Sequence, residues 1–137
     1  MENLIPHICH WFTVDNLSFL KRGGRISATI AVGGASLHMK PILHVDNEGH
    51  LVNVARVRGR GAVIKALFEK LVSTAVDIEE QTVMISHGDC YDDASKLADM
   101  IRSACHPKEI IINTINLVIG AHAGPGTLAL FFVGSER

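Results

Sequence analysis

The chain has 137 residues, of which 47% are hydrophobic and 20% charged, so it is long enough to bury a core as one globular domain. The net charge is −1, although residues 1–70 hold nine basic and five acidic side chains, and this excess is too small for a nucleic-acid-binding protein. No apolar run approaches the ~18–20 residues that span a bilayer and no signal-peptide pattern begins the sequence, so a cytoplasmic location is expected.

The first quarter of the chain predicts short elements and a stretch of small residues. Residues 10–14 are typical of a strand, and Asp15 is a candidate N-cap for a short helix that the next glycine pair ends. The stretch 25–38 has helix length but contains mostly small residues, with a glycine pair at Gly33. Because each glycine costs about 1 kcal/mol in a helix interior, this stretch indicates a surface that a neighbouring strand or a ligand approaches closely.

Two strands are predicted at residues 40–45 and 51–58, on either side of a turn sequence at 46–49, and they form an antiparallel hairpin. Strict alternation along the second strand places four side chains on one face: Val52, Val54, Arg56 and Arg58. Residues 60–76 follow with the apolar spacing of an amphipathic helix.

The second half predicts strand–helix–strand units. Strands are expected at 81–86 and 109–115, with an amphipathic helix between them that Asp89 caps, and residues 128–133 form a final apolar strand. The helices at 60–76 and after Asp89 each join two predicted strands, and these two strand–helix–strand units imply parallel pairing with right-handed crossovers, whereas the hairpin implies an antiparallel part. The predicted fold is therefore an α/β two-layer domain, with a mixed sheet of about six strands covered by helices.

A glycine-rich loop, residues 120–127 with the sequence GAHAGPGT, leads into the final strand after a short connection from residue 117. Glycine permits positive φ and close approach of the backbone, while Pro125 fixes its own φ. Such a loop is able to hold His122 at the end of a buried strand, where α/β proteins commonly build sites. A structural turn with a surface histidine explains the same residues equally well.

Three parts of the sequence carry groups able to hold an anion: residues 21–27, residues 56–60 and His122. Arg25 follows two glycines at a predicted helix start, and Arg58 ends a predicted strand. If these ends converge, guanidinium groups and an imidazole form a pocket for a carboxylate or phosphate. The alternative for any single arginine is a solvated charge.

The remaining candidate groups give little support to other chemistry. Cys9, Cys90 and Cys105 have no disulfide-framework spacing and are expected as reduced thiols. No Cys/His set matches a closed zinc framework, and no serine or cysteine lies in a nucleophile elbow. Neither a metal nor hydrolytic catalysis is therefore expected.

Five motifs, in order along the chain, resemble the carboxy-terminal domain of the DegV family of fatty-acid-binding proteins. They are 20–27 (LKRGGRIS), 40–43 (KPIL), 46–49 (DNEG), 56–60 (RVRGR) and 120–127 (GAHAGPGT). The resemblance covers nearly the whole chain and implies that residues 1–137 are one domain of that type. It also implies a two-layer α/β domain on a six-stranded mixed sheet.

Members of this family hold one long-chain fatty acid between two α/β domains. Several are the acyl-binding subunit of a bacterial fatty-acid kinase, and a separate ATP-dependent subunit phosphorylates the carboxylate. The resemblance implies that the chain is not itself an enzyme, needs no cofactor and has a fatty acid and the kinase subunit as partners. By motif, His122 would join the hydrogen-bond network around the head group, directly or through water, and Arg25 and Arg58 would organise that network or the kinase-docking surface.

Four small or apolar positions are candidates for the acyl-chain pocket: Ile26, Ile30, Gly33 and Leu37. Each buried CH₂ of an acyl chain is worth about 0.8 kcal/mol. An ordinary helix–sheet contact explains the same residues, and the sequence leaves both interpretations open.

The family's amino-terminal domain, whose Ser and Thr hydroxyls hold the carboxylate directly, has no counterpart in these residues. The chain is therefore expected to form half of the cleft and to self-associate through an exposed apolar face. The alternative is a protein-interaction or regulatory module that binds no lipid by itself.

Overall fold

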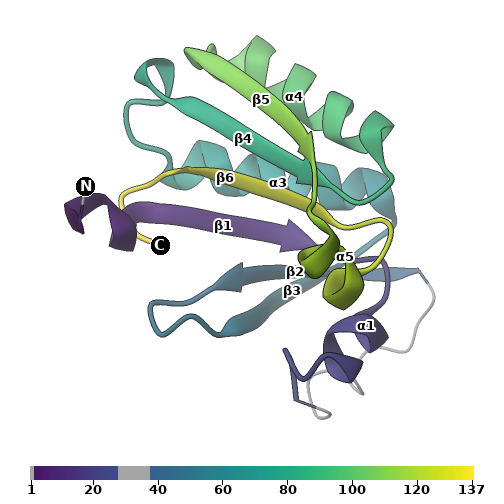
Figure 1. Cartoon of the computed structure of the whole chain (residues 1–137). Coiled ribbons are helices and arrows are strands. Elements are labelled where there is room, and N and C mark those ends of the chain that lie inside the picture. The colour runs from purple at the N-terminus through teal and green to yellow at the C-terminus, as the bar shows by residue number, and fades with distance from the viewer. Residues whose placement is uncertain (1, 28–37) are drawn as a thin grey trace.

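The structure is a computed structural model that describes residues 2–27 and 38–137 (Figure 1). Six strands form one mixed sheet in the order β3-β2-β1-β6-β4-β5, which confirms the predicted architecture. The strands are β1 (Ile8–Thr13), β2 (Met39–Val45), β3 (Leu51–Arg58), β4 (Thr82–His87), β5 (Glu109–Thr114) and β6 (Leu128–Val133). The α-helices are α1 (Leu17–Arg22), α3 (Arg60–Thr74), α4 (Tyr91–Cys105) and α5 (Leu117–Ala123), and the 3-10 turns are η1 (Glu2–His7) and η2 (Ile78–Glu80).

Among these six strands, only one adjacent pair is parallel. β4 and β5 pair in parallel through the crossover helix α4, as predicted, whereas β6 returns antiparallel between β1 and β4. The other predicted unit consists of β3, α3 and β4. Its two strands run in the same direction, but β2, β1 and β6 lie between them in the sheet, so the predicted direct pairing of this unit is wrong. The physical reason is that the short turn at 46–49 pairs β3 with β2 instead.

The main core lies between the sheet and the two long helices α3 and α4, which cover one face (Figure 1). It consists of alternate positions of the strands and one stripe of each helix: Cys9, Trp11, Ile42, Val63, Ile64, Leu67, Leu71, Val83, Ile85, Ala94, Leu97, Ala98, Ile101, Leu128, Leu130 and Phe132. The short helices α1 and α5 contact each other. They lie at one end of the sheet, where a second small core contains Val14, Leu20, Ile26, Leu43 and Ala123.

Two predicted helix caps are displaced by one residue. Asn16 caps α1, because its side chain accepts a backbone N–H at 2.8 Å, whereas the Asp15 carboxylate pairs with Lys40 at 2.6 Å. Cys90 is the residue before α4, and Asp89 takes a left-handed conformation with φ +53 in the preceding turn. In both cases the aspartate belongs to the turn rather than to the helix start.

A bulge in β3 changes which face its side chains occupy. The register with β2 shifts so that Val54 is left out of the direct pairs between these two strands. Val52 lies opposite His44, whose ring stacks on the Trp11 indole of the main core. Arg56 and Arg58 lie on either side of Val57, which packs on that core, so the two arginines belong to the opposite face. The predicted common face for Val52, Val54, Arg56 and Arg58 is therefore wrong, because a bulge resets the alternation.

All three cysteines are free thiols, in agreement with the sequence. Burial raises the pKa of each thiol, and for Cys90 the nearby Asp93 carboxylate raises it further while Arg60 lowers it. Thiols of raised pKa are poor nucleophiles at neutral pH.

Candidate functional site

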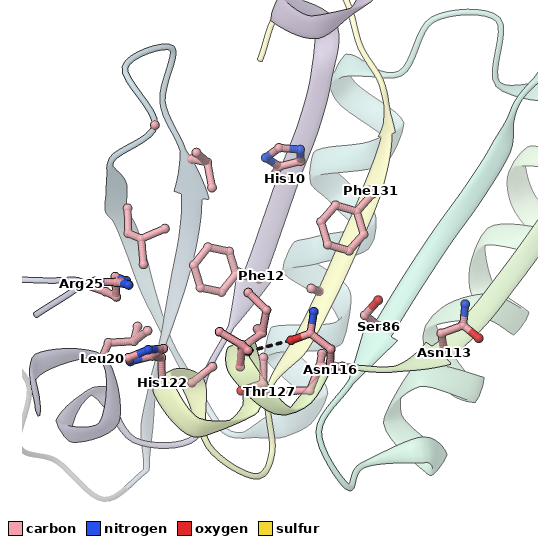
Figure 2. A pocket seen from close by; sticks show the side chains of 18 of the residues that line it. His10, Phe12, Leu20, Arg25, Ser86, Asn113, Asn116, His122, Thr127 and Phe131 are labelled. Atoms are coloured by element: carbon pink, nitrogen blue, oxygen red, sulfur yellow. Dashed lines mark hydrogen bonds between the residues drawn. The ribbon is translucent and has the colours of Figure 1, made fainter. Parts of the chain in front are cut away.

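A groove of about 860 Å³ lies on the sheet face opposite α3 and α4 (Figure 2). Its floor includes His10 and Phe12 of β1, Ser86 of β4, and Ala129 and Phe131 of β6. These side chains alternate along their strands with residues of the main core, so the same alternation that buries one face opens the other. The register places Ser86 beside Ala129 across the β4–β6 pair.

Helices α1 and α5 border the groove at one end, and the β2–β3 turn borders it at the other. Arg25 and His122 line it where α1 and α5 meet, and Val45, His50 and Leu51 line it beside the β2–β3 turn. Figure 2 shows Arg25 and His122 on the same side of the groove, close to Leu20. A cation and an imidazole thus stand at one end of a largely apolar trough.

The structure brings together two of the three polar candidates. Arg25 and His122 both line the groove, and the guanidinium of Arg25 donates to the carbonyl oxygen of Gly23 at 3.2 Å. Arg58 is exposed at the end of the edge strand β3 and is not among the residues that line the groove. Of the two roles predicted for Arg58, only the one at a docking surface is compatible with this position, and it stays a prediction.

One of the four acyl-pocket candidates lies in the described part of the chain. Ile26 is buried in the small core beneath α1 and is not among the groove-lining residues. The other candidates, Ile30, Gly33 and Leu37, fall outside the described residues. The groove-lining apolar side chains of β1 and β6 were not identified from the sequence.

His122 is held by a helix rather than by a loop. The Asn116 side chain caps α5 by accepting the N–H of Ile119 at 2.9 Å, so the segment predicted as a connection is helical through Ala123. His122 occupies the last turn of this helix, and its ring fills the position that a Cβ on Gly23 would take. The cap at Asn116 was the signal in the sequence that could have predicted the helix.

The turn after α5 interlocks with the segment around α1. Gly124 and Gly126 both have φ +81, and a Cβ at Gly124 would lie 2.8 Å from the ring of Phe19. A Cβ at Gly126 would lie 2.8 Å from the Cβ of Asp15. These glycines are therefore needed for both conformation and space, which explains much of the unusual composition of this segment.

Arg60, the last basic residue of the 56–60 segment, serves the fold instead of a ligand. Its Nε donates to the Asp93 carboxylate at 2.8 Å, and its Nη1 donates to the Gly126 carbonyl at 2.9 Å. The guanidinium thus links α3, α4 and the turn that follows α5.

The surroundings of two further histidines, His10 and His44, lower their pKa values. Burial lowers the pKa of His10, and the positive charge of Arg137, whose guanidinium donates to His10 Nδ1 at 3.4 Å, lowers it further. Burial also lowers the pKa of His44, where Asp46 opposes the shift and Lys70 and Arg137 add to it. Both imidazoles are thereby favoured as neutral groups in the folded protein.

The free energy of unfolding is therefore expected to decrease as the pH falls from about 7 to about 5. Histidine's ordinary pKa is about 6.5, and a lower value in the folded state means that the unfolded chain binds protons first. Urea unfolding at pH 7.0 and 5.5 measures this slope, and the double variant His10→Gln/His44→Gln should flatten it. An identical slope in that variant would contradict the assignment.

Within residues 2–27 and 38–137, no group of three or more His, Cys, Asp or Glu side chains is arranged to hold a metal ion. No helix among the same residues is long and apolar enough to cross a bilayer. The polar groups that line the groove include imidazole, guanidinium, amide and hydroxyl groups.

A protein-family model described as "Uncharacterised protein, DegV family" matches residues 1–135. The chain belongs to the DegV family. A DegV domain-containing protein from Clostridium perfringens is 49% identical over 130 residues, which are 95% of this chain and 45% of that relative. This DegV chain spans about half the length of the curated relatives that it matches.

Solved structures agree with the fold. A DegV family protein from Thermus thermophilus, described for its fatty-acid binding, is 29% identical with a TM-score of 0.83, over 97% of this chain and 48% of that one. The fatty acid kinase B3 protein of Streptococcus pneumoniae, loaded with linoleic acid, has a TM-score of 0.86 over 98% of this chain and 47% of that one. At 16% identity this second match concerns the fold alone.

Proposed function

We propose that this DegV chain binds a long-chain fatty acid in the groove, with the carboxylate at Arg25 and His122 and the acyl chain along Phe12 and Phe131. The observation that carries the proposal is the placement of a guanidinium and an imidazole at one end of an apolar trough of about 860 Å³. This volume lies in the range of about 300–1,000 Å³ usual for small-molecule sites. The relative from Thermus thermophilus supports the same ligand class.

The groove forms one wall of the site, and the part of DegV proteins that lies beyond this match supplies the other. The chain covers 45% of its relative from Clostridium perfringens, which leaves more than half of that protein to complete the cleft. In this arrangement the protein presents the fatty acid to a separate ATP-dependent kinase subunit rather than catalysing the reaction. Arg58, exposed on the edge strand, is suited to that docking surface.

His122→Ala and Arg25→Ala are each expected to weaken palmitate binding about tenfold, because a hydrogen bond to a charged group contributes about 1.5–3 kcal/mol. Isothermal titration calorimetry below the aggregation concentration of palmitate measures the affinity. His106→Asn and Arg102→Ala are matched controls, since both residues are exposed and belong to α4 or its end rather than to the groove. Wild-type affinity in both groove variants would refute the site assignment.

A second candidate function is a protein-interaction module that binds no lipid by itself. The observation that favours it is the apolar start of α5, where Leu117 is 92% exposed, Val118 69% and Ile119 52%. Exposed apolar surface of this kind marks an interaction site. Native mass spectrometry separates the two functions: a retained fatty acid supports the first, and a lipid-free homodimer supports the second.

A further inference from the structure

We propose that Gly23 is a positioning residue that holds the imidazole of His122 in its ligand-binding orientation. The proposal rests on the proposed function, since it concerns the same site. A Cβ built on Gly23 would overlap the His122 ring, with Nδ1 as the nearest atom and Cε1 and Cγ each at 3.2 Å. Gly23 also accepts a hydrogen bond from Arg25 through its carbonyl oxygen, so both polar groups of the site contact this one residue.

The need for glycine at this position comes from space and not from backbone conformation. Gly23 has φ −77 and ψ 0, close to the second central position of a type I turn, which is compatible with most residues. The adjacent Gly24 is the opposite case, because it has φ +67, but a Cβ added there would meet no atom of the described residues within 4 Å. The pair therefore divides two tasks: Gly24 permits the turn, and Gly23 makes room for the imidazole.

The contact also determines which ring nitrogen is available to a ligand. Nδ1, Cγ and Cε1 are the three atoms nearest to the side-chain position of Gly23, which places Nε2 on the more distant edge of the ring. We assign to Nε2 the hydrogen bond to the fatty-acid carboxylate. A ring displaced from Gly23 would lose this orientation without losing the histidine.

The surrounding structure leaves the ring as the part that must move. Gly124, just after α5, lies against Phe19 of α1, and Gly126 lies against Asp15, just before α1. These two further close contacts oppose a separation of the two segments that would accommodate a methyl group at position 23. A side chain such as His122 adjusts by rotation about its own bonds, which shifts the imidazole while the fold is retained.

Gly23→Ala is expected to change the ring ¹⁵N chemical shifts of His122 and to weaken palmitate binding about tenfold, as loss of a charged hydrogen bond would. Long-range ¹H–¹⁵N NMR of the ligand-free full chain measures the first effect, and calorimetry with palmitate measures the second. Gly61→Ala is the control, since position 61 on α3 has ordinary φ and open space among the described residues and is not one of the residues that line the groove.

The double variant Gly23→Ala/His122→Ala tests whether Gly23 acts through the ring. The proposal predicts that the double variant binds palmitate with the same affinity as His122→Ala alone. It would be overturned if Gly23→Ala lowered the palmitate affinity by the same factor with and without the His122 ring. Unchanged His122 shifts in a folded Gly23→Ala variant would also overturn it. If Gly23→Ala fails to fold, recovery of folding in the double variant supports the contact, and no recovery refutes it. Wild-type palmitate affinity in His122→Ala contradicts the proposed function, while the NMR shifts decide the contact independently.

Discussion

Replacing Gly124 with alanine is expected to lower the free energy of unfolding by about 3–4 kcal/mol. Gly124 has φ 81 and ψ 174, a region that only glycine populates readily, and forcing another residue into it costs about 1–3 kcal/mol. The new Cβ would also lie 2.8 Å from Phe19, and overpacking of this kind costs a further 1–3 kcal/mol or so. Urea denaturation at neutral pH measures the loss.

Gly59→Ala is the matched control for this experiment. Gly59 has nearly the same backbone conformation, with φ 85 and ψ 161, but its side-chain position meets no atom of the described chain within 4 Å. Its variant should therefore show the conformational cost alone. The additional loss of unfolding free energy at Gly124 comes from the contact with Phe19. In a Phe19→Ala background, Gly124→Ala should therefore cost little more than Gly59→Ala does in the wild type. Equal losses in Gly124→Ala and Gly59→Ala would show that the contact with Phe19 is unimportant.

Arg60→Ala is expected to lower the free energy of unfolding by about 2 kcal/mol. The substitution removes two charge-assisted hydrogen bonds, to Asp93 and to the Gly126 carbonyl, and leaves a partly buried carboxylate without its partner. Water reaches the pair, since the two side chains are 25% and 20% exposed, so the loss should be smaller than for a fully buried ion pair. Chemical denaturation and thermal melting both report it.

Arg102→Ala is the control for this second prediction. Arg102 pairs with Asp99 at the same 2.8 Å, but the two side chains are 60% and 69% exposed. Exposed ion pairs contribute about 0–1 kcal/mol, so this variant should remain close to the wild-type stability. If both arginine variants lost the same stability, the bridge from α3 to the turn after α5 would not be the cause.

The predictions for Gly124 and Arg60 mean that the glycine-rich segment stabilises the fold in addition to its proposed role in binding. Gly124 and Gly126 lock the end of α5 against the region of α1, and Arg60 holds the Gly126 carbonyl from the other side. The consequence of this construction is a fixed position for His122 in the last turn of α5. The alternatives of turn and site for this segment are therefore not exclusive, because the turn supports the proposed site.

Local patterns in the sequence predicted most of the elements. The hairpin, the two long helices and the final apolar strand at 128–133 follow from periodicity and turn residues, which depend on near neighbours along the chain. The motifs placed the chain in its family for a similar reason, since they are short and contiguous. Errors arose where two local signals competed. At the start of α1, both Asp15 and Asn16 are possible caps, and before the final strand the glycine-rich composition indicates a loop whereas the cap at Asn116 indicates a helix.

The tertiary structure alone decided which polar groups line the same groove. Arg25 and His122 are almost a hundred positions apart, and their meeting depends on α1 packing against α5. Arg58 and Arg60 are two residues apart, yet one is exposed on an edge strand and the other bridges α3 and α4. Strand order, the bulge in β3 and the burial of only one sheet face arise from contacts distant in sequence, and no pattern within one element encodes them. By itself the sequence determined the elements, the family and the candidate residues, whereas packing determined the groove and the residues that line it.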